Sequence, residues 1–243
     1  MVAYSDMPLF GGSFAKSLAL NLASEILGII LTVFLIDRVI SKQHEAELKR
    51  RKEVALLRLK EPLSRHAQFL FHMFKATVSA KPKTELVQIS DLFNDNFFAS
   101  TALLNLLQKA PLITERGEPN WAYYLVRESK ALHDSVGQFL SAYSFHSDVR
   151  LIELLETMLR DNFYEHVLVL QDIAGGPLAV GGDFQAFKNT AKVVFGPHVW
   201  AFQEIFEYFN RNAPNADRIN FVTHWENHIA PPIGSARILT PTT

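Results

Sequence analysis

The feature that most constrains this chain is an apolar run, residues 17–36, that leads without Pro into a strongly basic stretch. A helix of 20 residues rises about 30 Å, which matches the hydrocarbon core of a bilayer. Glu25 is the single formally charged residue of the run. A cleaved signal peptide fits less well, because the preceding basic region is weak and no small-x-small cleavage site follows. The run therefore predicts a transmembrane helix, with a buried hairpin helix as the alternative.

The basic residues that follow the apolar run predict its orientation. Residues 38–60 carry eight basic and three acidic side chains, whereas Lys16 is the one basic residue before the run. The positive-inside rule then places the short tail, 1–16, outside and the remainder in the cytoplasm, with the span in the inner (cytoplasmic) membrane. The belt expected to meet anionic lipids consists of Arg38, Lys42, Lys49, Arg50, Arg51 and Lys52. Residues 61–243 have more acidic than basic groups, so general nucleic-acid binding is not expected.

The polar and small residues of the apolar run share one face. At 100° per residue, they fall within an arc of about 100°. This association stripe consists of Asn21, Ser24, Glu25, Gly28 and Thr32. A carboxylate that faces lipid costs roughly 2.5–3.5 kcal/mol, and small residues let two helices approach closely. The stripe predicts self-association or a partner membrane protein; the alternative is that Glu25 reaches the interface without a functional role.

The rest of the chain has the pattern of an all-α protein. We expect a basic juxtamembrane helical stalk over 37–61, helical to about Lys60, a cytosolic α-helical domain over 62–230 and a flexible tail over 231–243. Apolar residues recur at 3–4 spacing without a convincing hairpin. The helices expected in the domain cover 64–80, 94–110, 121–146, 148–173, 184–214 with a break near Gly196-Pro197, and 215–229. The fold class expected is a helical bundle on a single membrane helix.

Metal and cofactor sites are not expected. The chain has no cysteine, which excludes disulfides and thiolate metal sites. His224 and His228 stand four residues apart and form a weak candidate pair, but no third ligand is evident. The glycine-rich segment 175–182 lacks the Lys-Ser/Thr of a phosphate-binding loop.

The segment "RDNFYEH", Arg160 to His166, resembles the R-x4–6-H motif of HEPN ribonucleases, which are helical bundles. The resemblance covers seven residues, and it implies that Arg160 and His166 polarise an RNA 2′-hydroxyl and phosphate across a dimer interface. Five Arg–His pairs have this spacing in the chain, where roughly 1.3 are expected by chance, so a single match has little specificity.

Three functions remain open on the sequence. The first is a membrane-anchored, self-associating or complex-forming protein whose cytosolic helical domain binds a partner or signal. By analogy of layout, this would be a membrane-acting effector of a bacterial defence or stress system. The second is a membrane-tethered ribonuclease that uses Arg160 and His166. The third is a structural subunit of a larger membrane complex.

Overall fold

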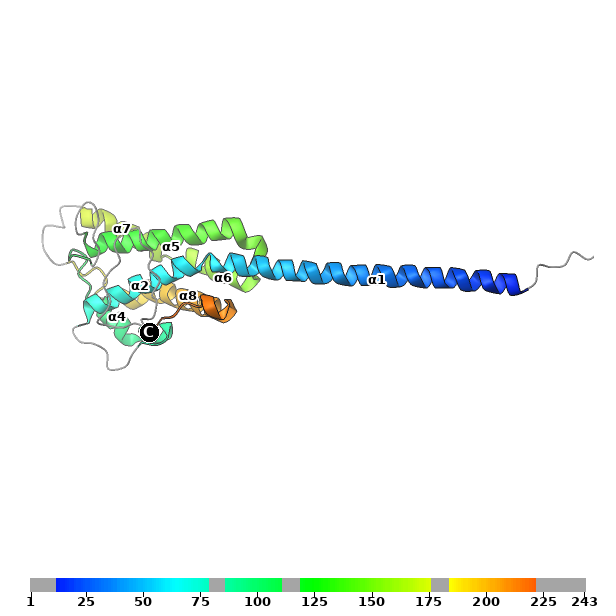
Figure 1. The fold of residues 1–243 in the computed structure, drawn as a ribbon. Coiled ribbons are helices and arrows are strands. Elements are labelled where there is room, and N and C mark those ends of the chain that lie inside the picture. The colour runs from blue at the N-terminus through cyan, green and yellow to red at the C-terminus, as the bar shows by residue number, and fades with distance from the viewer. Residues whose placement is uncertain (1–11, 79–85, 111–118, 176–183, 222–243) are drawn as a thin grey trace, which may run out of the picture. The chain divides into compact units, whose positions relative to one another are not determined.

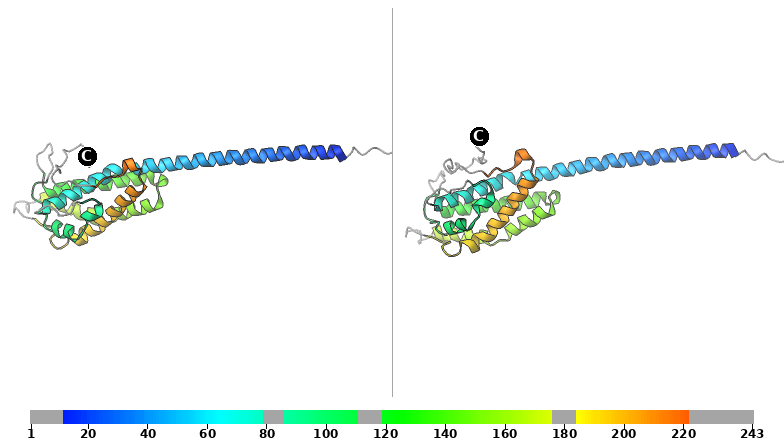
Figure 2. Two further views of the ribbon diagram at one scale, coloured as in Figure 1. Left: turned by 60° about the horizontal axis from the view of Figure 1, so that its bottom comes forward. Right: turned by 90° about the horizontal axis from the view of Figure 1, so that it is seen from below.

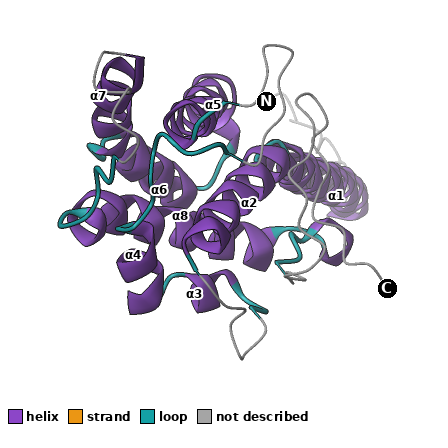
Figure 3. Ribbon diagram, turned by 90° about the vertical axis from the view of Figure 1, so that its left-hand side faces the viewer, coloured by secondary structure: helices purple, strands orange, loops and turns teal. Residues whose placement is uncertain are grey.

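The computed structural model describes residues 12–78, 86–110, 119–175 and 184–221. Every regular element in these ranges is a helix (Figures 1 and 3), so the all-α expectation is confirmed. The elements are α1 (Gly12–Leu57), α2 (Lys60–Thr77), α3 (Ile89–Leu92), α4 (Asp95–Thr101), α5 (Trp121–Tyr143), η1 (Ser144–His146), α6 (Val149–Leu159), α7 (Phe163–Gly175), α8 (Ala191–Asn212) and η3 (Asn215–Asp217).

The chain divides into two compact units, 1–50 and 51–243, and α1 runs through the boundary. In the first unit, the large apolar side chains between Leu18 and Ile40 are all exposed. No helix in the described part of the chain is long and apolar enough to cross a membrane. The single span expected over 17–36 is thus without support from this finding.

The junction between α1 and α2 differs from the uninterrupted helix expected to about Lys60. Helix α1 ends at Leu57 and α2 begins at Lys60. The cause is Pro62, which has no N–H to donate and whose ring collides with the carbonyl four residues earlier in a regular helix. That carbonyl belongs to Arg58, which lies in the break. The ladder resumes where the Leu63 N–H donates to the Leu59 carbonyl at 3.0 Å.

The second unit is a helical bundle with a phenylalanine-rich core. Helix α2 packs against α4 and α5, α5 packs against α6 and α7, and α8 packs against α4, α6 and α7. Figure 2 shows these helices from two further sides. The fully buried phenylalanines are Phe69, Phe71, Phe97, Phe195, Phe202, Phe206 and Phe209. Rings of this size bury a large apolar area and pack edge to face, and they supply the core that the 3–4 spacing predicts.

The helix expected over 94–110 is too long. Helix α4 ends at Thr101, and the chain continues in turns. The side chain of Asn105 explains the irregular path, because its Oδ1 accepts hydrogen bonds from the N–H groups of Leu107 at 3.0 Å and Phe184 at 3.1 Å. An amide that satisfies backbone donors in this way competes with helical hydrogen bonding.

The single helix expected over 148–173 is divided into α6 and α7 by a turn at residues 160–162. Asp161 caps the second helix, since its Oδ1 accepts a hydrogen bond from the Phe163 N–H at 3.1 Å. Side chains that bond to their own backbone favour helix starts over helix interiors. The turn therefore follows from Asp161, which the apolar spacing alone does not reveal.

The break expected near Gly196-Pro197 does not occur, because α8 continues through both residues. Phe195 and Val199 are fully buried on either side of the proline, so packing of the apolar face outweighs the lost hydrogen bond. Helix α8 begins at Ala191, and turns at residues 186–190 precede it. In the segment expected as a last helix, 215–229, the structure describes the short η3 and an irregular stretch to residue 221; the remainder lies outside the described residues.

Candidate ligand pocket between α2 and α5

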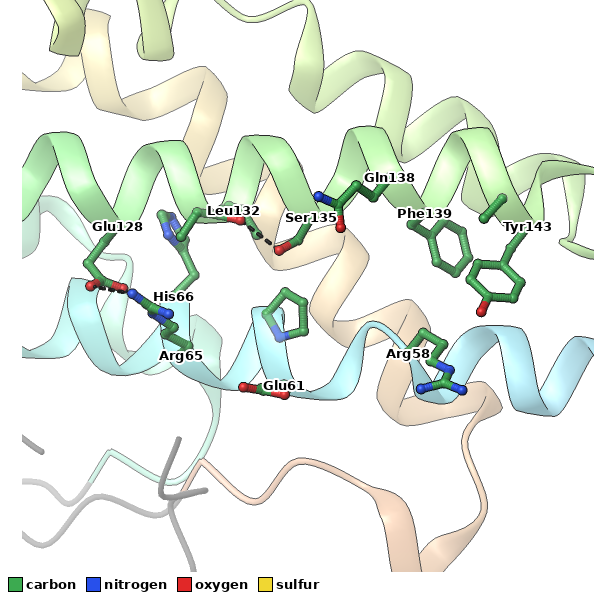
Figure 4. Close-up of a pocket in the computed structure, with 13 residues that line it drawn as sticks. Arg58, Glu61, Arg65, His66, Glu128, Leu132, Ser135, Gln138, Phe139 and Tyr143 are labelled. Carbon is green, nitrogen blue, oxygen red and sulfur yellow. Dashed lines mark hydrogen bonds and ion pairs between the residues drawn. The ribbon is translucent and has the colours of Figure 1, made fainter. Parts of the chain in front are cut away.

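A cavity of about 460 Å³ lies between the start of α2 and the second half of α5 (Figure 4). It begins at the α1–α2 break, where Arg58 lines it, and extends to Glu128. Its apolar lining consists of Pro62, Ala131, Leu132, Phe139 and Ala142. The volume falls within the roughly 300–1,000 Å³ of small-molecule sites. The polar groups along it decide which chemistry it suits.

A buried carboxylate closes one end of the cavity. The side chain of Glu128 is 2% exposed, and its carboxylate accepts hydrogen bonds from two guanidinium groups. Arg65 on α2 donates through Nη2 at 2.9 Å, and Arg127 on α5 donates through Nε at 2.8 Å. The hydrogen bond to Glu128 raises the pKa of Arg65 above its ordinary value. This cluster therefore carries one net positive charge.

A hydrogen-bonded chain of His66, His198 and Asp161 leads inward from the cavity wall. The Nε2 atoms of His66 on α2 and His198 on α8 are 3.0 Å apart. The Nδ1 atom of His198 lies 2.8 Å from Asp161 Oδ2 in the turn between α6 and α7. These contacts join α2, α8 and the turn through polar groups within a largely apolar interior. Adjacent residues of α2 thus contact different helices: Arg65 reaches α5 and His66 reaches α8.

The chain constrains the tautomers of both imidazoles. When His198 is neutral and Asp161 is ionised, His198 donates its Nδ1–H to Asp161 and accepts at Nε2 from His66. His66 then keeps a lone pair on Nδ1, which is buried and has no hydrogen-bond partner. Burial lowers the pKa of His66 well below its usual value, and the charges of His198 and Arg65 lower it further. His66 is therefore neutral at pH 7 and acts as an acceptor.

The opposite end of the cavity holds a guanidinium group without an acidic partner. Arg58 forms no ion pair with the described residues, and its side chain faces Tyr143 of α5 in Figure 4. Ser135 and Gln138 line the middle of the cavity from α5. The polar groups at the two ends thus differ: the carboxylate of Glu128 is paired with two guanidinium groups, whereas Arg58 has no ion-pair partner among the described residues.

The structure does not join Arg160 and His166, the pair expected for a ribonuclease. Arg160 Nη2 lies 2.8 Å from Glu156 Oε2 in an exposed ion pair. His166 Nδ1 lies 2.7 Å from the carbonyl oxygen of Asn162. The two side chains form no hydrogen bond with each other in the described residues, and neither lines the cavity. Their catalytic role stays a sequence-based prediction.

The residues of the association stripe all lie on exposed surface of α1. Two of their hydroxyls are satisfied within the helix: Ser24 donates to the Asn21 carbonyl at 2.9 Å and Thr32 donates to the Gly28 carbonyl at 2.8 Å. A Cβ added at Gly28 would have no neighbour within 4 Å. The role of the stripe in association stays a prediction.

The structure describes the residues of the predicted lipid-binding belt but not the predicted metal-binding pair. The six basic residues of the belt are exposed along α1. His224 and His228 lie outside the described residues. Within the described residues no group of three or more His, Asp or Glu side chains could hold a metal ion.

Sequence reasoning missed the residues that build the cavity. Glu128 carried a usable signal, because it stands three residues after Leu125 and four before Leu132 on the apolar face of its helix. A charged residue on a buried face indicates a paired carboxylate. His66 likewise stands on the apolar face of α2, between Leu63 and Leu70. The residues that pair with Glu128 and His66, namely Arg65 and His198, lie in distant segments, and no local sequence pattern indicates these pairings.

Comparison with known proteins finds no matching family model, no matching curated protein and no matching solved structure.

Proposed function

We propose that the chain is a membrane-anchored protein that self-associates through α1 and whose helical domain binds a partner or signal in the cytoplasm. One observation carries the proposal: apolar side chains are exposed on every face of α1, within the arc of the association stripe as well as outside it. Leu20 is 70% exposed, Ile29 63% and Phe34 59%. A helix that is apolar all round is buried in a protein core or a membrane.

The distribution of these side chains favours lipid over a single protein partner. At 100° per residue they surround the helix, and one packed helix cannot cover its whole circumference. Lipid covers such a surface without further protein. Asn21 and Glu25 reduce the hydropathy of residues 17–36. Contact of the stripe with a second copy of the chain would keep these two polar side chains away from lipid.

The basic belt supports the orientation of this proposal. Its six residues begin directly after residues 17–36 and are exposed. Basic side chains at this position are attracted to anionic lipids of the cytoplasmic leaflet and are retained on that side. The helical domain after residue 51 would then face the cytoplasm, where the cavity between α2 and α5 is open to small molecules.

Alkaline extraction of membranes tests the anchor. We expect the full chain to remain in the membrane pellet, as an integral protein does. Ile30→Arg should release part of it, because an arginine at mid-span costs roughly 2.5–3.5 kcal/mol. Leu48→Arg is the matched control, since Leu48 is also exposed on α1 but lies within the basic stretch. Complete release of the wild-type chain would overturn the proposal.

A further inference from the structure

We propose that the cavity between α2 and α5 binds a small organic anion, a carboxylate or phosphate joined to an apolar body. This ligand would be the signal that the helical domain binds, and in this respect the inference rests on the proposed function. The inference adds the chemical class of the signal. Neither the sequence pattern nor the comparisons assign a ligand to this place.

Charge decides in favour of an anion. Three guanidinium groups, those of Arg58, Arg65 and Arg127, stand at or beside the cavity against the carboxylates of Glu61 and Glu128. Glu128 is already shared by two of the arginines, so it cannot compensate the third. The excess is one positive charge, and a ligand with one anionic group would compensate it.

Arg58 is the group placed to receive that anion. It lies in the break between α1 and α2, faces Tyr143 across the cavity and forms no ion pair with the described residues. A guanidinium binds carboxylate or phosphate through parallel N–H donors, and hydrogen bonds with a charged partner are the stronger kind. The hydroxyl of Tyr143 is a further donor at the same end.

The cavity offers apolar walls to the body of the ligand. Pro62 from α2 and Ala131 and Ala142 from α5 line it at positions that are not fully buried, and the nearly buried Leu132 and Phe139 lie beside them. A ring or short alkyl chain of the ligand would leave water on entering the cavity, which supplies affinity that an inorganic anion lacks.

The test uses the full chain in an uncharged detergent and two probe anions, 3-phenylpropionate and phenyl phosphate, with 3-phenylpropan-1-ol as the uncharged control. Ligand-observed saturation-transfer NMR measures the dissociation constants. We expect saturable binding of at least one anion and binding at least about tenfold weaker for the alcohol, the difference a charge-assisted hydrogen bond supplies. The preferred anion distinguishes a carboxylate ligand from a phosphate ligand.

Two variants locate the site. Arg58→Gln should weaken anion binding by about tenfold and leave the alcohol unchanged. Arg160→Gln is the matched control, because this exposed arginine lies outside the cavity. Ala142→Trp, at an exposed position of the cavity lining, should weaken binding of all three probes by filling the space. Circular dichroism verifies that each variant is folded.

Three outcomes would overturn the proposal: no saturable binding of either anion at millimolar concentration, equal binding of anion and alcohol, or equal anion binding by the wild type and Arg58→Gln. Failure of the membrane anchor is distinguishable, because binding in detergent does not depend on insertion. If the chain binds the anion but is extracted from membranes, the proposed binding site stands and the proposed membrane anchor is wrong.

Discussion

Glu128 accepts hydrogen bonds from Arg65 and Arg127 while its own carboxylate is withdrawn from solvent. Removal of this carboxylate leaves part of Arg127 buried without compensation. We expect Glu128→Ala to lower the free energy of unfolding by about 3 kcal/mol. Arg65→Ala should cost less than about 1 kcal/mol, because Arg65 is 43% exposed and Arg127 still pairs with Glu128. Urea unfolding followed by circular dichroism measures both, and equal losses would contradict the account.

His66 should make the helical domain sensitive to acid. Its pKa is lowered in the folded state by burial, with contributions from His198 and Arg65, so below about pH 6.5 the unfolded state binds a proton that the folded state does not. The stability is complete above that pH and falls as pH decreases toward the lowered pKa. The other charged groups in this region are Asp161, which contacts His198, and Glu128, which contacts Arg65.

A comparison of two variants tests this pH dependence. The wild-type free energy of unfolding should fall below pH 6.5 with a slope that is steeper than that of His66→Leu by up to about 1.4 kcal/mol per pH unit. His166→Leu should keep the wild-type slope, because His166 is exposed. The contrary result is a parallel pH profile for the wild type and His66→Leu.

Helix α8 shows at the scale of elements how packing overrides local preference. Gly196 and Pro197 are both unfavourable inside a helix, yet the helix passes through them. A Cβ at Gly196 would meet the Trp200 ring at 3.5 Å, an ordinary contact. Gly196→Ala should therefore raise the free energy of unfolding by about 0.5–1 kcal/mol. A loss of stability in urea unfolding would show that α8 is distorted at this position.

Elements with regular apolar spacing could be predicted from the sequence, and their interruptions could not. Helix α5 follows the expected range closely because Leu125, Leu132 and Phe139 recur on one face and are buried. The turn between α6 and α7 depends on a single capping side chain, Asp161, within an otherwise helical pattern. The end of α4 depends on a contact of Asn105 with Phe184, 79 positions away. Long-range contacts of this kind leave no local pattern.

The residues of the candidate site were likewise predictable only where a local sequence pattern marked them. Glu128 was detectable as an acid on an apolar face, but its pairing with Arg65 required the packing of α2 on α5. Arg58 became a candidate only through the break that Pro62 causes. The shared face of the stripe residues on α1 follows from helical spacing alone, whereas their role in self-association stays a prediction.

At the scale of the whole molecule, self-association should follow the stripe. With no native cysteine in the chain, single cysteines can be introduced without background. In native membranes, those at positions 21, 25, 28 and 32 should crosslink between chains, and those at 23, 26 and 30 should not. The reason is that the first set shares one arc of α1. Equal crosslinking around the helix, or none at any position, would mean that this face is not the contact.

The account depends most on an α1 that crosses the membrane with its helical domain in the cytoplasm, and thiol labelling in intact bacterial cells tests this directly. Ser5→Cys, before the proposed span, and Lys130→Cys, exposed on α5, are treated with a membrane-impermeant maleimide. We expect labelling of the cysteine at position 5 in intact cells and of the cysteine at position 130 after permeabilisation alone. Labelling at position 130 in intact cells, or protection of position 5 until permeabilisation, would contradict the central claim.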